Sequence, residues 1–338
     1  ADLALELDDQ LAEAHLAKGL LLAWLPPNDV AAGEAEIRRA IELDPRLANA
    51  HRELGNLLVR KLGRVVEGVD ALAAADELEP FWAMSKGQLS RAYLAKGDLV
   101  GAMRTSREYF ELRPSLGVHA PGFEHMVFQG FDAAEGSVQA ALEQGDSTFA
   151  FWLALLFAAE GRTSEVSAFM DPDLYDFEKG AVELYARDYA TAARHLTRAY
   201  DTFEFGRGYP ARFPSRFLND PDTLLGCALL GAGEEEAALR PLSEAERVYA
   251  DRIARGDTSF QARIQMSAIH ALRGDKEAAY GWLQQAIDAG FFAYAEAERH
   301  PFFESLHEEE RFQRMMAGVK AKVEEMRRQV AAMDEPGR

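Results

Sequence analysis

The chain of 338 residues contains a single cysteine, Cys227. One cysteine excludes a disulfide within the chain and any zinc site built from several cysteines. Cys227 follows Gly226 in a segment with helical spacing of its apolar residues. We therefore interpret it as a small buried apolar side chain rather than as a nucleophile.

Long apolar segments and basic residues are both scarce. The longest uninterrupted apolar run, 149–159, has 11 residues, too few to cross a hydrocarbon layer of about 30 Å. Lys and Arg number 37 against 56 Asp and Glu, which gives a formal net charge of −19. Nucleic-acid binding depends on clustered cations that neutralise phosphates. We therefore expect neither direct membrane insertion of this chain nor a nucleic-acid partner.

Common catalytic and cofactor motifs are missing from the sequence. It has no Gly-x-Ser-x-Gly, His-Glu-x-x-His, phosphate-loop or Cys-x-x-Cys motif. Segment 171–176 superficially resembles a calcium loop, but it lacks the glycine at the sixth position and an oxygen ligand at the fifth. The pairs His119/His125 and His300/His307 do not have the spacing that places two ligands on one helical face, so we interpret them as surface or packing residues. We expect no enzymatic activity, no cofactor and no metal.

What the sequence does have is an internal repeat. Pro45, Pro80 and Pro114 lie 35 and 34 residues apart. Between them the same order of residue types recurs: His51, Leu54, Gly55, Leu58, Gly68, Leu72 and Ala75 in one copy, and Leu89, Ser90, Tyr93, Ala102, Ser106 and Tyr109 in the next. A period of about 34 residues with this order resembles the tetratricopeptide repeat, in which each unit is a pair of antiparallel helices. Such units stack to bury their apolar faces and commonly bind other proteins.

The repeat predicts an all-α fold. We expect a right-handed tetratricopeptide superhelix, an α-solenoid of about seven or eight helix pairs, closed by a C-terminal capping helix. The predicted divisions are regular repeat units over 1–116 with the first pair truncated, degenerate units over 117–218, repeat units over 219–308, and the capping helix and tail over 309–338. Residues 4–9 match the end of a second helix, so we expect this chain to be part of a longer protein.

The capping helix is predicted from a stripe of apolar residues at helical spacing. The stripe comprises Phe312, Met315, Met316, Val319, Val323 and Met326. An apolar stripe of this kind is suited to covering the last repeat, which otherwise exposes its apolar face.

The C-terminal quarter resembles a narrower group of proteins. It reads Gly-Asp-x-x-Ala-Ala over 274–279, Ala-Ile-Asp-Ala-Gly-Phe over 286–291, and Pro-x4-Leu-x4-Arg-Phe-Gln over 301–313. Together with 35–45, these segments resemble the tetratricopeptide arrays of bacterial signalling proteins that carry a class III nucleotide cyclase, a winged-helix domain or a protein kinase domain. His300 departs from that pattern, where an acidic residue is expected.

The resemblance implies a regulatory or sensory array with a protein or peptide partner. Two alternatives stay open. One is a freestanding adaptor that captures peptide tails for a chaperone or assembly machine, and the other is an auxiliary domain of an enzyme whose catalytic part is absent. The sequence leaves the location open between the cytoplasm and the periplasm, including attachment to a membrane through an upstream segment. The oligomeric state is open as well.

One polar stripe is a candidate binding site. Arg52, Asn56 and Arg60 recur at every fourth residue, and Arg91 lies one repeat, 35 residues, after Asn56. First helices line the concave groove of this fold, so we expect these side chains to face solvent and to bind a peptide carboxylate. The alternative is an ordinary solvated helix face.

The segment 203–217 is a second candidate. Two prolines and two glycines interrupt a helix there, whereas five aromatic residues argue against disorder. Loops of this length in compact proteins are often functional. Its candidate contact residues are Arg207, Tyr209, Arg212 and Arg216. The alternative is an insertion between repeats that packs on its neighbours.

Overall fold

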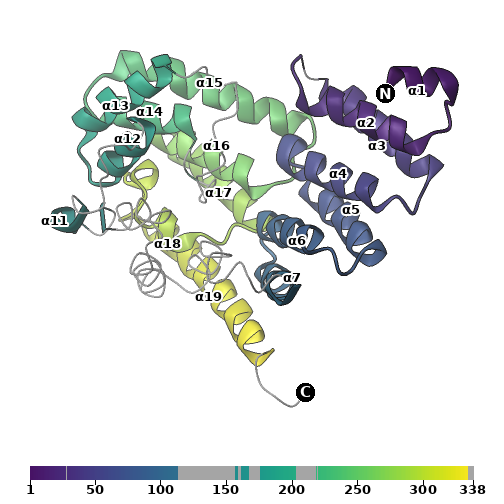
Figure 1. Ribbon diagram of the computed structural model, residues 1–338. Coiled ribbons are helices and arrows are strands. Elements are labelled where there is room, and N and C mark those ends of the chain that lie inside the picture. The colour runs from purple at the N-terminus through teal and green to yellow at the C-terminus, as the bar shows by residue number, and fades with distance from the viewer. Residues whose placement is uncertain are drawn as a thin grey trace. The chain divides into compact units, whose positions relative to one another are not determined.

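The computed structural model describes residues 1–27, 29–112, 157–158, 161–166, 176–202, 218 and 220–333 (Figure 1). All regular secondary structure in these ranges is helical, and none of it is strand, which confirms the all-α prediction. The chain divides into two compact units, one of 1–117 with 252–259 and one of 118–251 with 260–338.

Three sequence predictions fall outside the described residues. They are the first part of the predicted degenerate units, 117–146, the calcium-like segment apart from Asp176, and the aromatic and arginine-rich segment 203–217. The pair His119/His125 lies outside them as well.

The first unit is a succession of helix pairs. Its helices are α1 (Asp2–Leu7), α2 (Ala12–Trp24), α3 (Val30–Leu43), α4 (Ala48–Leu57), the π-helix η1 (Leu58–Leu62), α5 (Val65–Leu78), α6 (Ala83–Lys96) and α7 (Leu99–Leu112). The pairs are α2 with α3, α4 with α5, and α6 with α7, and each pair packs on the next through α3 with α4 and α5 with α6. These pairs match the predicted period.

Small residues set the distance within each pair. A Cβ on Gly55 would lie 2.5 Å from Cγ of Leu72, so glycine lets α4 approach α5 closely. In the next pair Ser90 holds the equivalent place, and its hydroxyl donates to the carbonyl oxygen of Ala102 at 2.8 Å. The repeated position therefore carries either glycine or a serine that bonds across the pair.

The turn inside the third pair forms as its residues predict. Gly97 ends α6 with a φ of 79°, in the left-handed region that glycine adopts without strain. The carboxylate of Asp98 then accepts from the backbone N–H of Gly101 at 2.8 Å, which caps α7.

The second pair contains a feature that the repeat pattern does not predict. After α4 the chain continues as the π-helical turn η1, which ends at Gly63 with a φ of 65°. Segment 252–259 packs there within the same unit, and the backbone N–H of Thr258 donates to the carbonyl oxygen of Gly63 at 3.0 Å. The buried carboxylate of Asp257 pairs with Arg252 at 2.7 Å beside this contact. Gly63 thus joins residues nearly 200 positions apart within one unit.

The second unit contains further helix pairs. Its described helices are α11 (Thr163–Val166), α12 (Asp176–Tyr185), α13 (Tyr189–Thr202), α14 (Pro221–Gly231), α15 (Glu235–Ala254), α16 (Phe260–Leu272), α17 (Lys276–Asp288), α18 (Tyr294–Ala297), the 3₁₀-helix η4 (Pro301–Phe303) and α19 (Glu310–Ala332). The helices α12 and α13 pack together, as do α16 and α17.

The same small-residue position recurs in this unit. A Cβ on Gly226 of α14 would lie 2.5 Å from Leu242 of α15. On α16 the hydroxyl of Ser267 donates to the carbonyl oxygen of Ala279 at 2.8 Å, as Ser90 does to its own partner. Cys227 is buried, and burial raises the pKa of its thiol. Both observations agree with the interpretation of Cys227 as a packing residue.

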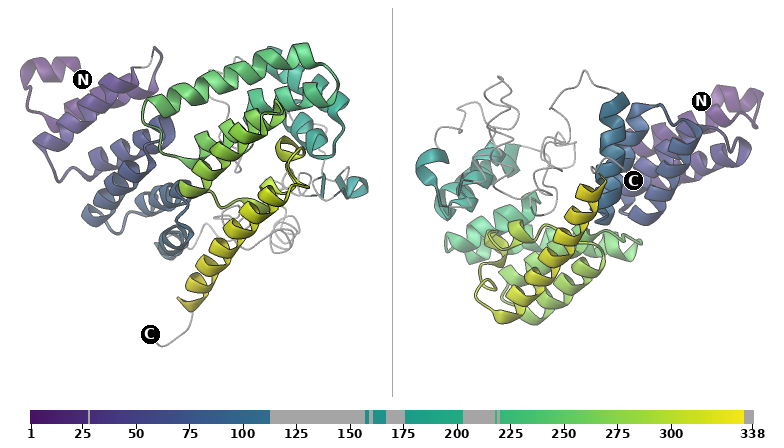
Figure 2. Two further views of the ribbon diagram at one scale, coloured as in Figure 1. Left: turned by 180° about the vertical axis from the view of Figure 1, so that it is seen from behind. Right: turned by 90° about the horizontal axis from the view of Figure 1, so that it is seen from below.

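The predicted C-terminal helix is α19, which packs on α17 and α18 (Figure 2). Phe312, Met316, Val319 and Val323 are buried, whereas Met315 and Met326 are only half-buried. The apolar stripe is therefore confirmed for most of its members, and its role as a cap stays a prediction.

His300 and His307 are packing residues. His300 is fully buried, its Nδ1 accepts from the backbone N–H of Phe302 at 3.3 Å, and its ring lies 4.7 Å from that of Tyr185. Burial and the nearby Arg187 lower the pKa of His300 well below its ordinary value, so the ring is neutral. His307 is half-buried and contacts the carbonyl oxygen of Ala297 through Nε2 at 3.2 Å.

Candidate functional site

The predicted polar stripe lies on α4, η1 and α6 of the first unit, and Arg52 is its most constrained member. The centre of its guanidinium lies 3.6 Å from the centroid of the Trp82 ring. One nitrogen donates to the side-chain oxygen of Asn49, and only 6% of Arg52 is exposed. The expectation that Arg52 faces solvent is wrong, because the aromatic residue at the start of α6 covers it.

The electrostatics of Arg52 follow from this burial. Burial lowers the pKa of Arg52, and the nearby carboxylates of Glu53 and Glu79 oppose that shift. Its Nε lies 3.5 Å from Glu53. Its Nη1 is buried and has no hydrogen-bond partner within the part of the chain that the structure describes. Such a group would gain a charge-assisted bond from any acceptor oxygen that reached it.

Asn56 and Arg60 do not continue one exposed face with Arg52. Asn56 is buried, whereas Arg60 is exposed in η1 with its guanidinium 5.2 Å from the Trp24 ring of α2. A π-helical turn has more residues than an α-helical turn, so the four-residue spacing does not keep its register there. Arg52 and Arg60 consequently lie against different tryptophans, Trp82 and Trp24.

Arg91 is exposed on α6, as predicted. Lys86, nearer the beginning of that helix, is buried and forms ion pairs with Asp76 at 2.7 Å and Glu108 at 2.5 Å. These ion pairs join α5, α6 and α7. Arg91 and Lys96 are therefore the exposed cations of α6, whereas Lys86 is a buried structural residue.

The structure adds three apolar residues that the sequence interpretation did not select. Phe81, Trp82 and Met84, at the beginning of α6, are 85%, 39% and 45% exposed. We call these three residues the α6 aromatic edge. A signal for it exists in the sequence, because the preceding repeat has Arg46 and Leu47 at the places of Phe81 and Trp82.

The described residues offer neither a cluster of metal ligands nor a membrane span. They contain no group of three or more His, Cys, Asp or Glu arranged to hold a metal ion. In the same ranges, no helix is both long and apolar enough to span a bilayer.

Comparison with known proteins adds little to these observations. No family model matches the sequence, and no curated protein matches it. Among solved structures, a tetratricopeptide repeat protein from Parabacteroides merdae ATCC 43184 is 12% identical over 92% of this chain and 99% of its own, with a TM-score of 0.35. The tetratricopeptide domain of P58(IPK) is also 12% identical, over 94% and 98%, with a TM-score of 0.27. Both TM-scores are too low to establish a shared fold. The described chain is an all-α solenoid because of its helix pairs, with their repeated glycine or serine.

Proposed function

We propose that this chain is a protein-interaction module that binds a segment of a partner protein at the α6 aromatic edge. The observation that carries the proposal is the exposure of Phe81, Trp82 and Met84 within four consecutive positions. Neighbouring large apolar side chains that stay in water are typical of binding surfaces. Aromatic residues flanked by arginine are also the residue types that dominate binding energy at protein interfaces.

The surrounding residues support a peptide ligand with an apolar side chain and a carboxylate. Phe81 and Met84 offer flexible apolar contact area, while Trp82 is held in place by its stack on Arg52. A side chain that is already ordered loses little entropy on binding. The exposed cations Arg60 of η1 and Arg91 of α6 lie in the same unit and would bind carboxylates by charge-assisted hydrogen bonds.

The biological setting that we propose is a regulatory or sensory array of a bacterial signalling protein. The supporting pattern is the similarity of 35–45 and 274–313 to arrays of that kind. A freestanding peptide-capturing adaptor and an auxiliary enzyme domain are the alternatives. The genomic sequence upstream of Ala1 discriminates among them. A membrane segment with a cyclase or winged-helix domain supports the first, a signal peptide or a bare start codon supports the second, and a metabolic enzyme domain supports the third.

The segment 203–217 stays a hypothesis beside this proposal. Its candidate residues Arg207, Tyr209, Arg212 and Arg216 combine aromatic and cationic character. A partner that also contacts this segment would lose affinity when these four residues are replaced together.

The proposal is tested by selecting peptides from a displayed library on the intact chain and titrating the selected peptides. We expect the double variant Phe81→Ser and Met84→Ser to weaken binding at least about tenfold. Val66→Ser is the matched control, because Val66 is an exposed apolar residue of α5 outside the edge. Selected peptides that bind the double variant and the parent chain equally well would refute the proposal.

A further inference from the structure

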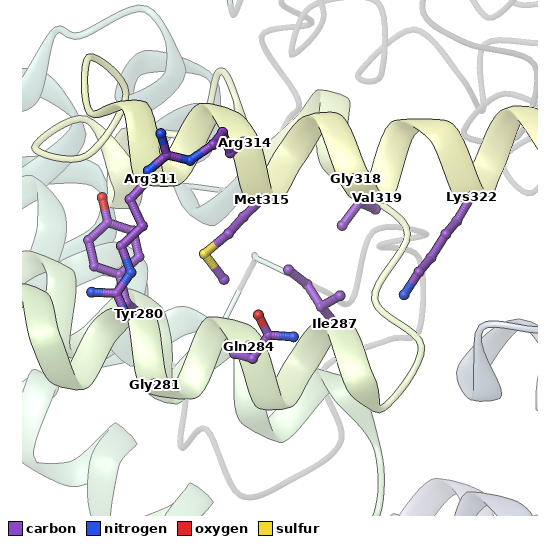
Figure 3. A pocket seen from close by; sticks show the side chains of 10 residues that line it. All are labelled: Tyr280, Gly281, Gln284, Ile287, Arg311, Arg314, Met315, Gly318, Val319 and Lys322. Carbon is purple, nitrogen blue, oxygen red and sulfur yellow. The ribbon is translucent and has the colours of Figure 1, made fainter.

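A second surface lies in the second unit, between α17 and α19. A groove of about 470 Å³ separates the two helices there. Figure 3 shows Ile287 of α17 and Met315 of α19 extending from opposite sides into this space. Both are half-buried, and the buried Val319 completes an apolar floor.

Two glycines keep the groove open. Gly281 lies within α17 and Gly318 within α19, and both line the groove. A Cβ at either position would meet no heavy atom within 4 Å. Glycine lowers helix stability relative to alanine, and helix packing gives no reason for either glycine. What their missing side chains do provide is free space along both walls.

The charges along the groove all have one sign. Among the described residues that line it, the ionisable ones at neutral pH are Arg311, Arg314 and Lys322, with no carboxylate. This is unusual in a chain with a net charge of −19. A cationic rim above an apolar floor complements a segment that carries both carboxylates and aliphatic side chains.

The three cations differ in how far they are already engaged. Arg311 stacks on Tyr280 at 4.2 Å and pairs with Glu277 at 2.9 Å, so it is fixed at one end of the groove. Arg314 pairs with Glu310 at 3.1 Å, but both side chains are largely exposed, and a pair of this kind contributes little. Lys322 is exposed. Arg314 and Lys322 are thus available to a ligand at little cost.

We propose that this groove binds an acidic amphipathic segment of a partner protein. Aliphatic side chains of the segment would lie between Ile287 and Met315, and its carboxylates would pair with Arg314 and Lys322. From Arg311 to Lys322 the wall measures about 16 Å at 1.5 Å per residue, which suits about three helical turns of ligand. The residues of the groove are different from those of the α6 aromatic edge, and the proposal does not depend on binding there.

The first test compares two labelled amphipathic peptides by fluorescence anisotropy. Both have about 15 residues with leucine at helical spacing, and the remaining positions are glutamate in one and lysine in the other. The overall charge of the chain favours the lysine peptide, whereas the groove favours the glutamate peptide. We expect the glutamate peptide to bind with saturation. Its failure to bind the intact chain would overturn the proposal.

Variants then place the binding in the groove. Gly318→Leu fills the free space without a clash. It should therefore weaken binding of the glutamate peptide at least about tenfold, and the melting temperature of the protein should stay the same. Ala317→Leu, the adjacent exposed position outside the groove, is the matched control. Lys322→Glu should also weaken binding, and Lys320→Glu, exposed on the same helix, should not. Unchanged affinity in Gly318→Leu would overturn the proposal.

Two further outcomes count against it. If Phe81→Ser with Met84→Ser abolishes binding of the glutamate peptide, the peptide occupies the α6 aromatic edge instead. If the chain alone forms a dimer that Gly318→Leu converts to a monomer in sedimentation experiments, the occupant is a second copy of the chain. Retained binding in the first case and a monomer in the second are the results we expect.

Discussion

The guanidinium of Arg52 lies 3.6 Å from the centre of the Trp82 ring, across the boundary between two repeats. A residue whose spacing suggested an exposed ligand-binding group is therefore also a packing contact between α4 and α6. The contact orders Trp82 at the surface proposed to bind the partner. Replacing Arg52 would therefore affect both the stability of the fold and the binding surface.

Removing Arg52 should consequently cost stability. We expect Arg52→Ala to lower the free energy of unfolding by about 1–2 kcal/mol, through loss of the cation–π contact and of the buried side-chain stem. Arg91→Ala, at an exposed position, should stay within about 0.5 kcal/mol of the parent chain. Urea unfolding of both variants measures the difference. Equal stability of the two would show that the stack contributes nothing.

The carboxylate hypothesis for the polar stripe keeps its own test. Arg91→Ala should weaken binding of a peptide that ends in a free carboxylate by about 1.5–3 kcal/mol, because a charge-assisted hydrogen bond is lost. Amidation of the peptide terminus should have a similar effect, and the two changes together should not add. Calorimetric titration measures these affinities. If neither change alters the affinity, the polar stripe is an ordinary solvated helix face.

The serine that bonds across the helix pair should contribute measurably to stability. Ser90→Ala removes a buried hydrogen bond to the carbonyl oxygen of Ala102 and should cost about 0.5–1.5 kcal/mol. Ser267→Ala should cost a similar amount in the other unit, because the bond to Ala279 has the same length of 2.8 Å. Thermal unfolding that is unchanged in both variants would contradict this role.

Gly63 should be intolerant of any side chain. Its φ of 65° disfavours other residues, and a Cβ would lie 2.2 Å from the Asp257 carboxyl group. Gly233 is the matched control, since its φ of 81° is similar but a Cβ there would meet nothing within 4 Å. We expect Gly233→Ala to cost about 1–2 kcal/mol and Gly63→Ala clearly more. If both variants lose the same free energy of unfolding in urea, segment 252–259 moves to accommodate the Cβ without an energetic cost.

The buried His300 should make the protein acid-sensitive. Its pKa is lowered in the folded state, so between its unfolded pKa of about 6.5 and the lower folded value the unfolded chain binds more protons. Stability is therefore complete above about pH 6.5 and falls as the pH decreases, by up to about 1.4 kcal/mol per pH unit for this one group.

His300→Asn is the appropriate variant for this test. Asparagine retains an acceptor for the backbone N–H of Phe302 but does not titrate. Urea unfolding of both proteins from pH 7.5 to 5 should show a smaller loss in the variant. Asp222, whose pKa burial raises to about 6, acts with the opposite sign, and its contribution cancels in the comparison because it is present in both proteins. Parallel pH profiles would contradict the assignment.

The fold could be predicted largely because the repeated residue types reflect how the two helices of each pair pack. Gly55 against Leu72, and Ser90 against Ala102, are local consequences of residue size at a fixed place in each pair. The turn at Gly97 and the long helix of 310–332 were predictable for the same reason, since capping and apolar spacing are read from neighbouring residues. Contacts between distant segments, such as Gly63 with Thr258, leave no periodic signal.

The candidate site was less predictable. Helical spacing places Arg52, Asn56 and Arg60 on one stripe, but it does not reveal the π-helical turn at 58–62 or the aromatic side chain that covers Arg52. Phe81 and Trp82 were visible as departures from the preceding repeat. Their exposure, however, depends on how α4 and α6 pack, which a sequence pattern does not specify.

The central claim, that the α6 aromatic edge binds the partner, is tested most directly by hydroxyl-radical footprinting of the intact chain with and without a selected peptide. Phe, Trp and Met side chains oxidise readily, and Phe81, Trp82 and Met84 are exposed in the free chain. We predict that saturating peptide protects all three, while the exposed Met333 in the other unit reacts at an unchanged rate. Unchanged oxidation of Phe81, Trp82 and Met84 under saturating peptide would contradict the account.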